Sequence, residues 1–183
     1  MYRSFGLSQS DPGQENYYFD IANYQPSWQC GLSAITRANG SRLGRLRGRS
    51  LTRSWLLWDR NDDEWFTDAP VVLDFAGEQL EINHQKFDDL SLTWNTIDPL
   101  LHVPYPDFDL VWRDDAVAQL ARLQARTVTA VDLLEYRGDD MANGMIAVGI
   151  GFGDDYLVVQ NNLDENGLAF GSPQREYHAH PIR

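Results

Sequence analysis

Hydrophobic and polar residues alternate in two stretches of the chain, residues 71–83 and residues 146–159. In the first stretch Val71, Leu73 and Phe75 are separated by single residues, and the alternation resumes after an Ala-Gly turn. A period of two places every second side chain on the same face of a β-strand. Each stretch therefore predicts a β-hairpin with one face in the core.

Both hairpins belong to a longer repeat. Residues 43–82 and 120–159 align without a gap and are identical at 13 of 40 positions, whereas unrelated sequences agree at about one position in fifteen. A duplication explains this agreement, and it places Phe75 and Phe152 at equivalent core positions. Each copy is predicted to contain a helical turn, a strand, a polar turn and the hairpin. A fourth strand follows, where the 77-residue offset fails and we expect an insertion or deletion.

Helical patterns are short. In the second copy an Asp-Asp pair is a suitable cap for a helix that we predict near residues 114–124. In the first copy Gly44 and Gly48 limit the helix to about one turn. Upstream, residues 28–39 fit either a short helix or a strand, and the Asn-Gly pair at their end is expected to terminate it.

Neither copy has enough strands to cover its own apolar face, so the copies are expected to share one core. The predicted fold is mainly β (β-rich α+β), a single domain of residues 1–183 in which two pseudo-twofold halves form a barrel or two packed sheets. The linker, rich in proline, and the tail are expected to lack regular structure. The expected segments are an N-terminal arm and lead-in at 1–42, the first repeat at 43–96, a linker and helix start at 97–119, the second repeat at 120–173 and a tail at 174–183.

The two hairpins differ on their outer faces. The first carries the polar residues Asp74, Glu81 and Asn83 there, which is typical of a half-solvated strand. The second carries small and large apolar residues, which implies that something packs closely on it. We expect the aromatic arm around residues 17–24 to cover this second face, or the face to form a homodimer or partner interface. The residues of the second face are Ala147, Gly149, Gly151, Tyr156 and Val158.

Composition limits the partners. The net charge of −12 repels nucleic acid and anionic membranes over long range; it serves solubility in most proteins, and a basic or cationic partner is the more specific interpretation. No apolar run approaches the ~20 residues of a membrane helix, and the N-terminus lacks a signal-peptide pattern. The single cysteine excludes an internal disulfide. We therefore expect a cytoplasmic protein with neither a nucleic acid nor a membrane partner.

Cys30 is the candidate nucleophile. Residues 29–34, with the sequence QCGLSA, resemble papain-type and bacteriocin-processing cysteine peptidases. The resemblance implies that Cys30 opens a helix and that Gln29 supplies an oxyanion donor. Such enzymes need a histidine within reach of the sulfur, and His84, at the end of a repeat strand, is the best placed. The alternative, which we expect, is a buried and slowly reacting thiol with no histidine near it.

Patterns for metal binding are incomplete. Asp-Asp pairs recur at 62–63 and 139–140, and clustered carboxylates suit Ca²⁺, but Asp, Asn and Gly are also the residues that tight turns use. His178 and His180 lie on one side of an extended segment, with no third ligand at a spacing typical of zinc. We therefore expect no metal and no cofactor.

Aromatic residues and arginines supply a candidate binding surface, because Trp and Arg are enriched at interaction hot spots. Core packing of the aromatic residues and ion pairing of the arginines within the chain are the alternatives. The predicted binding residues are Trp55, Trp58, Trp65, Phe66, Arg47, Arg49 and Arg53.

No motif for a phosphate loop, a dinucleotide, a serine hydrolase or a zinc cluster is present, which favours a binding protein over an enzyme. We expect a non-enzymatic interaction protein with a protein partner, similar in kind to immunity or escort proteins. Two alternatives stay open. One is a cysteine hydrolase that uses Cys30, and the other is a small-molecule or sugar binder in the cleft between the halves.

Overall fold

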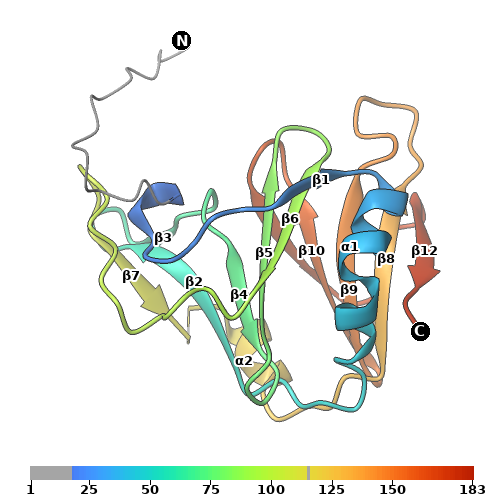
Figure 1. Cartoon of the computed structure of the whole chain (residues 1–183), viewed down its shortest axis with the longest axis horizontal. Coiled ribbons are helices and arrows are strands. Elements are labelled where there is room, and N and C mark those ends of the chain that lie inside the picture. Colours follow the sequence, from blue (N-terminus) through green and yellow to red (C-terminus); the bar gives the residue numbers. More distant parts are fainter. Residues whose placement is uncertain (1–17, 115) are drawn as a thin grey trace.

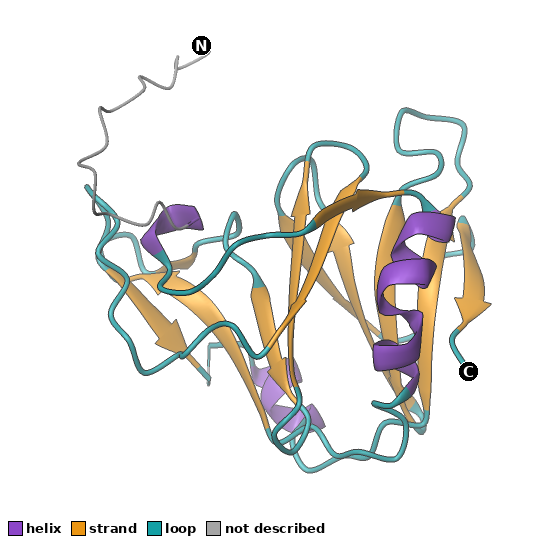
Figure 2. Ribbon diagram, in the orientation of Figure 1, coloured by secondary structure: helices purple, strands orange, loops and turns teal. Residues whose placement is uncertain are grey.

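The fold is mainly β. The computed structural model describes residues 18–114 and 116–183, and within them twelve strands form two antiparallel sheets beside two α-helices and one 3-10 turn, η1 (Tyr18–Asp20). Figures 1 and 2 show the two sheets facing each other across the molecule. The two predicted arrangements were a closed barrel and two packed sheets. The barrel is not closed, and the strands form two packed sheets.

The first sheet has the strand order β1-β6-β5-β4-β2-β3, and β7 also pairs with β2. The second sheet has the order β11-β10-β9-β8-β12. The strands of the first sheet are β1 (Trp28–Cys30), β2 (Arg53–Asp59), β3 (Glu64–Trp65), β4 (Val71–Asp74), β5 (Gln79–Gln85), β6 (Asp89–Trp94) and β7 (Leu110–Arg113). Those of the second are β8 (Ala130–Tyr136), β9 (Ile146–Phe152), β10 (Asp155–Asn161), β11 (Asn166–Phe170) and β12 (Tyr177–Pro181).

The series β6-β5-β4-β2 in the first sheet has the same order as β11-β10-β9-β8 in the second. β2 and β8 begin and end 77 positions apart, as 53–59 and 130–136. In the fourth strands, the partner of Leu80 is Trp94 and the partner of Leu157 is Phe170. Trp94 and Phe170 are 76 positions apart, so the turn before the fourth strand is one residue shorter in the second half.

The two halves meet about a local twofold axis. Ser50 and Thr127, which are 77 positions apart, form an isolated antiparallel bridge. Around it, the N–H of Leu51 donates to the carbonyl oxygen of Arg126 at 3.0 Å, and the N–H of Val128 donates to that of Arg49 at 2.8 Å. Each of these bonds is the counterpart of the other, which is the reciprocity of an isologous contact.

One hydrophobic core lies between the sheets. Phe75 and Phe152 are both buried in it, together with apolar residues from both halves. Helix α1 (Leu32–Gly44) contacts β8, and helix α2 (Ala118–Leu123) contacts β2, so the helix of each half packs on a strand of the other half (Figure 1). This exchange explains why neither half could bury its apolar face alone.

Helix α1 is longer than the single turn predicted, and it continues through the Asn-Gly pair that was expected to end it. The reason is tertiary. The Asn39 Nδ2 donates to the Gln29 Oε1 at 3.1 Å, and the Asn39 Oδ1 accepts from the Trp94 Nε1 at 3.1 Å. Helix α2 begins later than predicted, with Val117 rather than an aspartate at its N-cap. Among the described residues, none of the helices is long and apolar enough to cross a membrane.

The predictions that the arm covers the second half and that the outer face of the first half is solvated were wrong. The arm packs on the first half, where Ile21 and Tyr24 are buried against β2 and β4. Glu81 and Asn83, expected to face solvent, are fully buried beneath it. The Glu81 Oε1 accepts the backbone N–H groups of Thr96 at 2.8 Å and of Ile97 at 3.4 Å, so this carboxylate bonds to the backbone where the linker begins rather than to water. Tyr17 of the predicted arm lies outside the described residues.

The outer face of the second half is covered by its own side chains. The Tyr156 ring lies across Gly149, where a Cβ atom would overlap the Tyr156 hydroxyl. This hydroxyl donates to the Asp132 Oδ2 at 2.6 Å. Leu134 and Val158 are buried in the same small cluster, against which Tyr177 of β12 packs. The small residues of this face therefore make room for a tyrosine of the same sheet.

Two segments expected to be irregular contain strands. β7 lies at the end of the predicted linker and pairs with β2, while β12 lies in the predicted tail and pairs with β8. Both extend a sheet at an edge that would otherwise expose unpaired backbone groups. The hydrogen bonds of the sheet edge, rather than a sequence period, order these segments.

Candidate functional site

Cys30 is exposed at the end of β1, which contradicts the expectation of a buried thiol. Its Sγ–H donates to the Asp89 Oδ1 at 2.9 Å. This hydrogen bond, followed by burial and the nearby carboxylates, raises the pKa of the thiol to about 11. Gln29 turns to Asn39, as described above, and does not act as a donor beside the sulfur.

His84 belongs to a buried polar clasp between the two sheets. Its Nδ1 lies 3.1 Å from the Asn166 Oδ1, and its Nε2 lies 3.2 Å from the carbonyl oxygen of Ile146. Both ring nitrogens therefore face the second sheet, whereas the Cys30 thiol bonds to Asp89. The structure brings an acid, Asp89, to the thiol and not the histidine that a cysteine hydrolase requires.

We predict that Cys30 reacts slowly with iodoacetamide at pH 7.5. A pKa two units above that of an ordinary thiol lowers the thiolate fraction about 100-fold, and the greater intrinsic nucleophilicity of such a thiolate recovers about 10-fold. The expected rate is about 10-fold below that of a cysteine in a short peptide. Asp89→Asn should restore the rate, and Asp139→Asn is the control. A rate in native protein above that of the peptide would contradict this.

The remaining candidates for metal binding do not form a complete site. Among the described residues, Cys30, Asp88 and Asp89 are the trio of potential ligands that converge, and the ammonium of Lys86 lies 3.2 Å from an Asp89 oxygen. The His178 and His180 rings contact each other with centroids 4.7 Å apart. The His180 Nε2 lies 2.9 Å from the Glu135 Oε2, so the pair joins neighbouring strands.

The predicted binding residues do not form one surface. Trp55 packs on the apolar cluster beneath the arm, whereas Trp65 packs on the central core. Trp58 lies under the Arg113 guanidinium at 4.9 Å, and its Nε1 donates to Asp63 at 3.0 Å.

The arginines also divide. Arg49 donates to the carbonyl oxygen of Phe75 at 3.3 Å, and Arg126 makes the equivalent bond to that of Phe152 at 3.1 Å. Arg47 and Arg53 are exposed. Of all seven predicted binding residues, the structure brings Trp65 and Phe66 together at one concave site.

This site is a groove floored by aromatic rings. The Phe19 ring makes edge contacts with Phe66 and Tyr105, with both pairs of centroids 5.3 Å apart. Tyr105 stacks on Phe108 at 5.5 Å, and Tyr18 completes the set. The cavity has a volume of about 390 Å³. A neighbouring cavity of about 220 Å³ shares Phe66 and Phe108 with it and includes Trp65. We call the two together the acidic aromatic groove.

Its charge comes from carboxylates. Asp68 lines both cavities, Asp164 lines the larger one, and Asp59 and Glu64 line the smaller one. Burial, and then Glu165 and Asp164, raise the pKa of Asp68. Of the described residues that line the groove, Lys86 alone is cationic, and it pairs with Asp89. Crowded carboxylates beside electron-rich ring faces attract a positive charge.

The sequence missed most of this groove. Tyr105 and Phe108 lie in the proline-flanked linker, and Asp68 and Asp164 lie in turns, where aspartate has a purely local role in most proteins. Two aromatic residues within a segment that has no hydrophobic period were the available signal. Tyr18 and Phe19 were recognised as an apolar arm but were placed on the wrong half.

No family model, curated protein or solved structure matches this chain. The function must therefore be argued from the chemistry of the site itself.

Proposed function

We propose that the protein is a non-enzymatic binding protein whose acidic aromatic groove receives a cationic side chain of a basic protein partner. The observation that carries the proposal is the convergence of five aromatic rings with Asp68 and Asp164 in one cavity. A cation over an aromatic face gains about 0.5–2 kcal/mol, and nearby carboxylates add to that attraction. The net charge of −12 accelerates encounter with a basic partner.

Apolar residues beside the groove support a protein partner over a small ion. Phe87 and Leu163 are 43% and 83% exposed, in the turns that follow β5 and β10. These turns lie side by side, joined by a hydrogen bond from Asn161 to the carbonyl oxygen of Lys86 (Figure 1). Lys86 and Asp164, which line the groove, lie in the same turns. Exposed apolar groups next to a charged pocket are typical of interaction surfaces.

We also infer that the chain arose by duplication of one strand-hairpin unit and that it works in a reducing compartment such as the cytoplasm. The reciprocal bonds about Ser50 and Thr127, and the matching strand order of the two sheets, support the duplication. The single cysteine supports the compartment.

The test is binding of a blocked octalysine peptide in 0.15 M salt, followed by NMR titration of Phe66, Tyr105 and Phe108. We expect Asp68→Asn combined with Asp164→Asn to weaken binding at least 10-fold, because two carboxylates close to a cation together contribute more than about 1.4 kcal/mol. Asp62→Asn combined with Asp139→Asn changes the net charge equally at exposed turns and should weaken binding less than 2-fold.

Equal losses in the two double variants would refute the groove and reduce the effect to long-range charge. An octaglutamate peptide should not bind. Shifts of the groove residues with a neutral oligosaccharide, and none with octalysine, would favour the sugar-binding alternative.

A further inference from the structure

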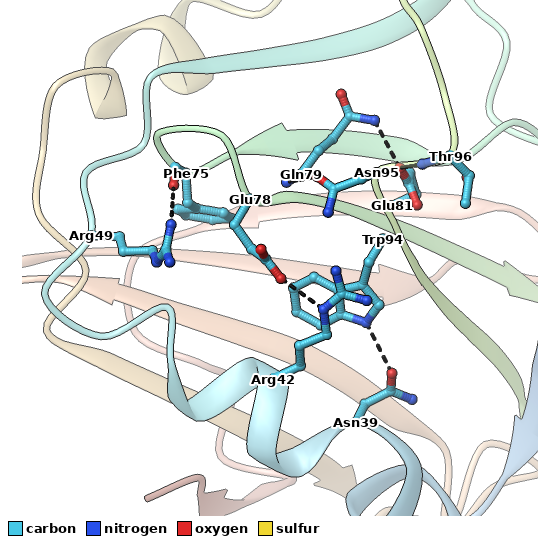
Figure 3. Close-up of polar contacts among 10 residues, drawn as sticks. All are labelled: Asn39, Arg42, Arg49, Phe75, Glu78, Gln79, Glu81, Trp94, Asn95 and Thr96. Carbon is cyan, nitrogen blue, oxygen red and sulfur yellow. Dashed lines mark hydrogen bonds and ion pairs between the residues drawn. The ribbon is translucent and has the colours of Figure 1, made fainter.

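One set of structurally equivalent positions carries different side chains in the two halves. In the first half, the Arg42 guanidinium lies over the Trp94 ring at 4.8 Å. Its Nε also donates to the Glu78 Oε1 at 2.7 Å. Figure 3 shows Arg42 reaching from α1 between the carboxylate and the ring. The first half thus holds a guanidinium that the chain itself supplies.

In the second half the same frame lacks that guanidinium. Gln119 stands where the first half has Arg42, Asp155 where it has Glu78, and Phe170 where it has Trp94. The shorter side chain of Gln119 leaves a cavity of about 260 Å³, lined by Gln119, Asp155, Tyr156 and Phe170 among others.

The backbones of the two places correspond. The N–H of Asn95 donates to the carbonyl oxygen of Gln79 at 3.1 Å, and the N–H of Gly171 donates to that of Tyr156 at 2.8 Å. Asn95 and Gly171 both have positive φ, 58° and 96°. The ring and the carboxylate therefore stand on the same scaffold in both halves.

The cavity of the second half retains the two kinds of group that bind Arg42 in the first half, an aromatic ring and a carboxylate. Phe170 is 36% exposed, and among the described residues no guanidinium stacks over its ring. The Asp155 side chain is 51% exposed, and one of its oxygens lies 3.1 Å from Arg126. An exposed carboxylate beside an exposed ring suits a guanidinium, which stacks and donates in a plane.

Two arginines near the cavity do not argue against a further guanidinium. Arg122 lines the cavity and Arg126 pairs with Asp155. Their counterparts in the first half, Arg45 and Arg49, are also arginines, and in that half Glu78 pairs with Arg42 while Arg49 donates to the carbonyl oxygen of Phe75. In the first half, therefore, the Arg42 guanidinium binds to the ring and the carboxylate although arginines also stand at the two other positions.

We propose that the cavity of the second half binds an arginine side chain of a protein partner, in the manner in which the first half binds its own Arg42. This site is separate from the acidic aromatic groove. Asp155 is the first residue of β10, and Asp164 follows the end of that strand, so the two sites lie about 20 Å apart. A basic partner could occupy either site without the other.

The halves provide their own matched variants. N-acetyl-arginine amide is titrated into the full chain, with the amide signals of Tyr156 and Gly171 followed by NMR. Gln119→Arg closes the second cavity with the residue used by the first, and should weaken binding there at least 10-fold. Arg42→Gln opens the first cavity, and should create a second site reported by Asn95. The expected numbers of sites at these two places are one in the native chain, none in Gln119→Arg and two in Arg42→Gln.

Two controls separate the chemistry. N-acetyl-citrulline amide has nearly the same shape without the charge, and should bind at least 10-fold more weakly. Asp68→Asn in the groove should leave the shifts of Gly171 unchanged, so this result does not depend on the groove. Unchanged binding in a folded Gln119→Arg, or equal binding of the citrulline compound, would overturn the proposal. Tighter binding of free arginine than of the blocked form would overturn the assignment to a protein side chain.

Discussion

Asn166→Ala is expected to lower the free energy of unfolding by about 4 kcal/mol, because this one side chain ties the second sheet to the first. Asn166 is 1% exposed. Its Nδ2 donates to the carbonyl oxygen of Ala69 at 2.9 Å and to the Asn83 Oδ1 at 2.7 Å, while its Oδ1 accepts the N–H of His84 at 2.9 Å. Each of these buried groups loses a partner in the variant, at about 1–3 kcal/mol apiece.

Chemical denaturation of the two proteins measures this difference. Asn162→Ala makes the same chemical change in the exposed turn before β11, and is expected to change stability by less than about 0.5 kcal/mol. Asn166→Asp retains the size but replaces the donor by an oxygen that faces other oxygens, so it should be no more stable than Asn166→Ala. A loss of less than about 1 kcal/mol in Asn166→Ala would mean that packing alone holds the sheets together.

The clasp also shows where prediction from the sequence ends. Alternation identified the hairpins because strand period is local, and a residue such as Val71 is buried whatever its sheet packs against. The same alternation placed Glu81 and Asn83 in solvent. It could not indicate that the arm and the linker would bury them, because that burial depends on segments distant in sequence. Polar residues on a regular strand indicate exposure only when nothing covers the strand.

The residues of the candidate site also differ in whether local sequence could identify them. Phe66 was identified because it lies in an aromatic segment of the first repeat. Tyr105 and Phe108 were not, because a linker rich in proline has no period from which a facing residue can be inferred. Cys30 was identified by its local sequence, but its exposure and its acidic partner Asp89 follow from the pairing of β1 with β6.

The 77-residue repeat is the part of the sequence that was most informative about the second site. The offset of 77 residues pairs Arg42 with Gln119, and a substitution between the copies is visible in the sequence alone. The sequence alone does not show what this substitution does to the site. Trp94 and Phe170 correspond only after the one-residue change in the turn before the fourth strand is taken into account. Strand pairing supplies that correction.

Lowering the pH from 7.5 to 5 is expected to destabilise the native chain by about 2 kcal/mol through His84 alone. Burial, opposed in part by hydrogen bonds to Asn166 and Ile146, lowers the pKa of His84 from 6.5 to about 4 in the folded state. Between these two values the unfolded chain binds a proton that the folded chain does not. The contribution of His84 to the free energy of unfolding is therefore fully present above pH 6.5 and is lost as the pH falls toward 4.

His84→Gln cannot titrate, so its free energy of unfolding should fall by about 2 kcal/mol less than that of the native chain over the same range. Carboxyl groups that titrate near pH 5 are present in both proteins, and their contributions cancel in the comparison. Equal pH dependence in the two proteins would show that His84 is protonated in the folded clasp. In that state both ring nitrogens would donate, Nδ1 to Asn166 and Nε2 to Ile146. A positively charged His84, rather than a neutral one, would then join the two sheets.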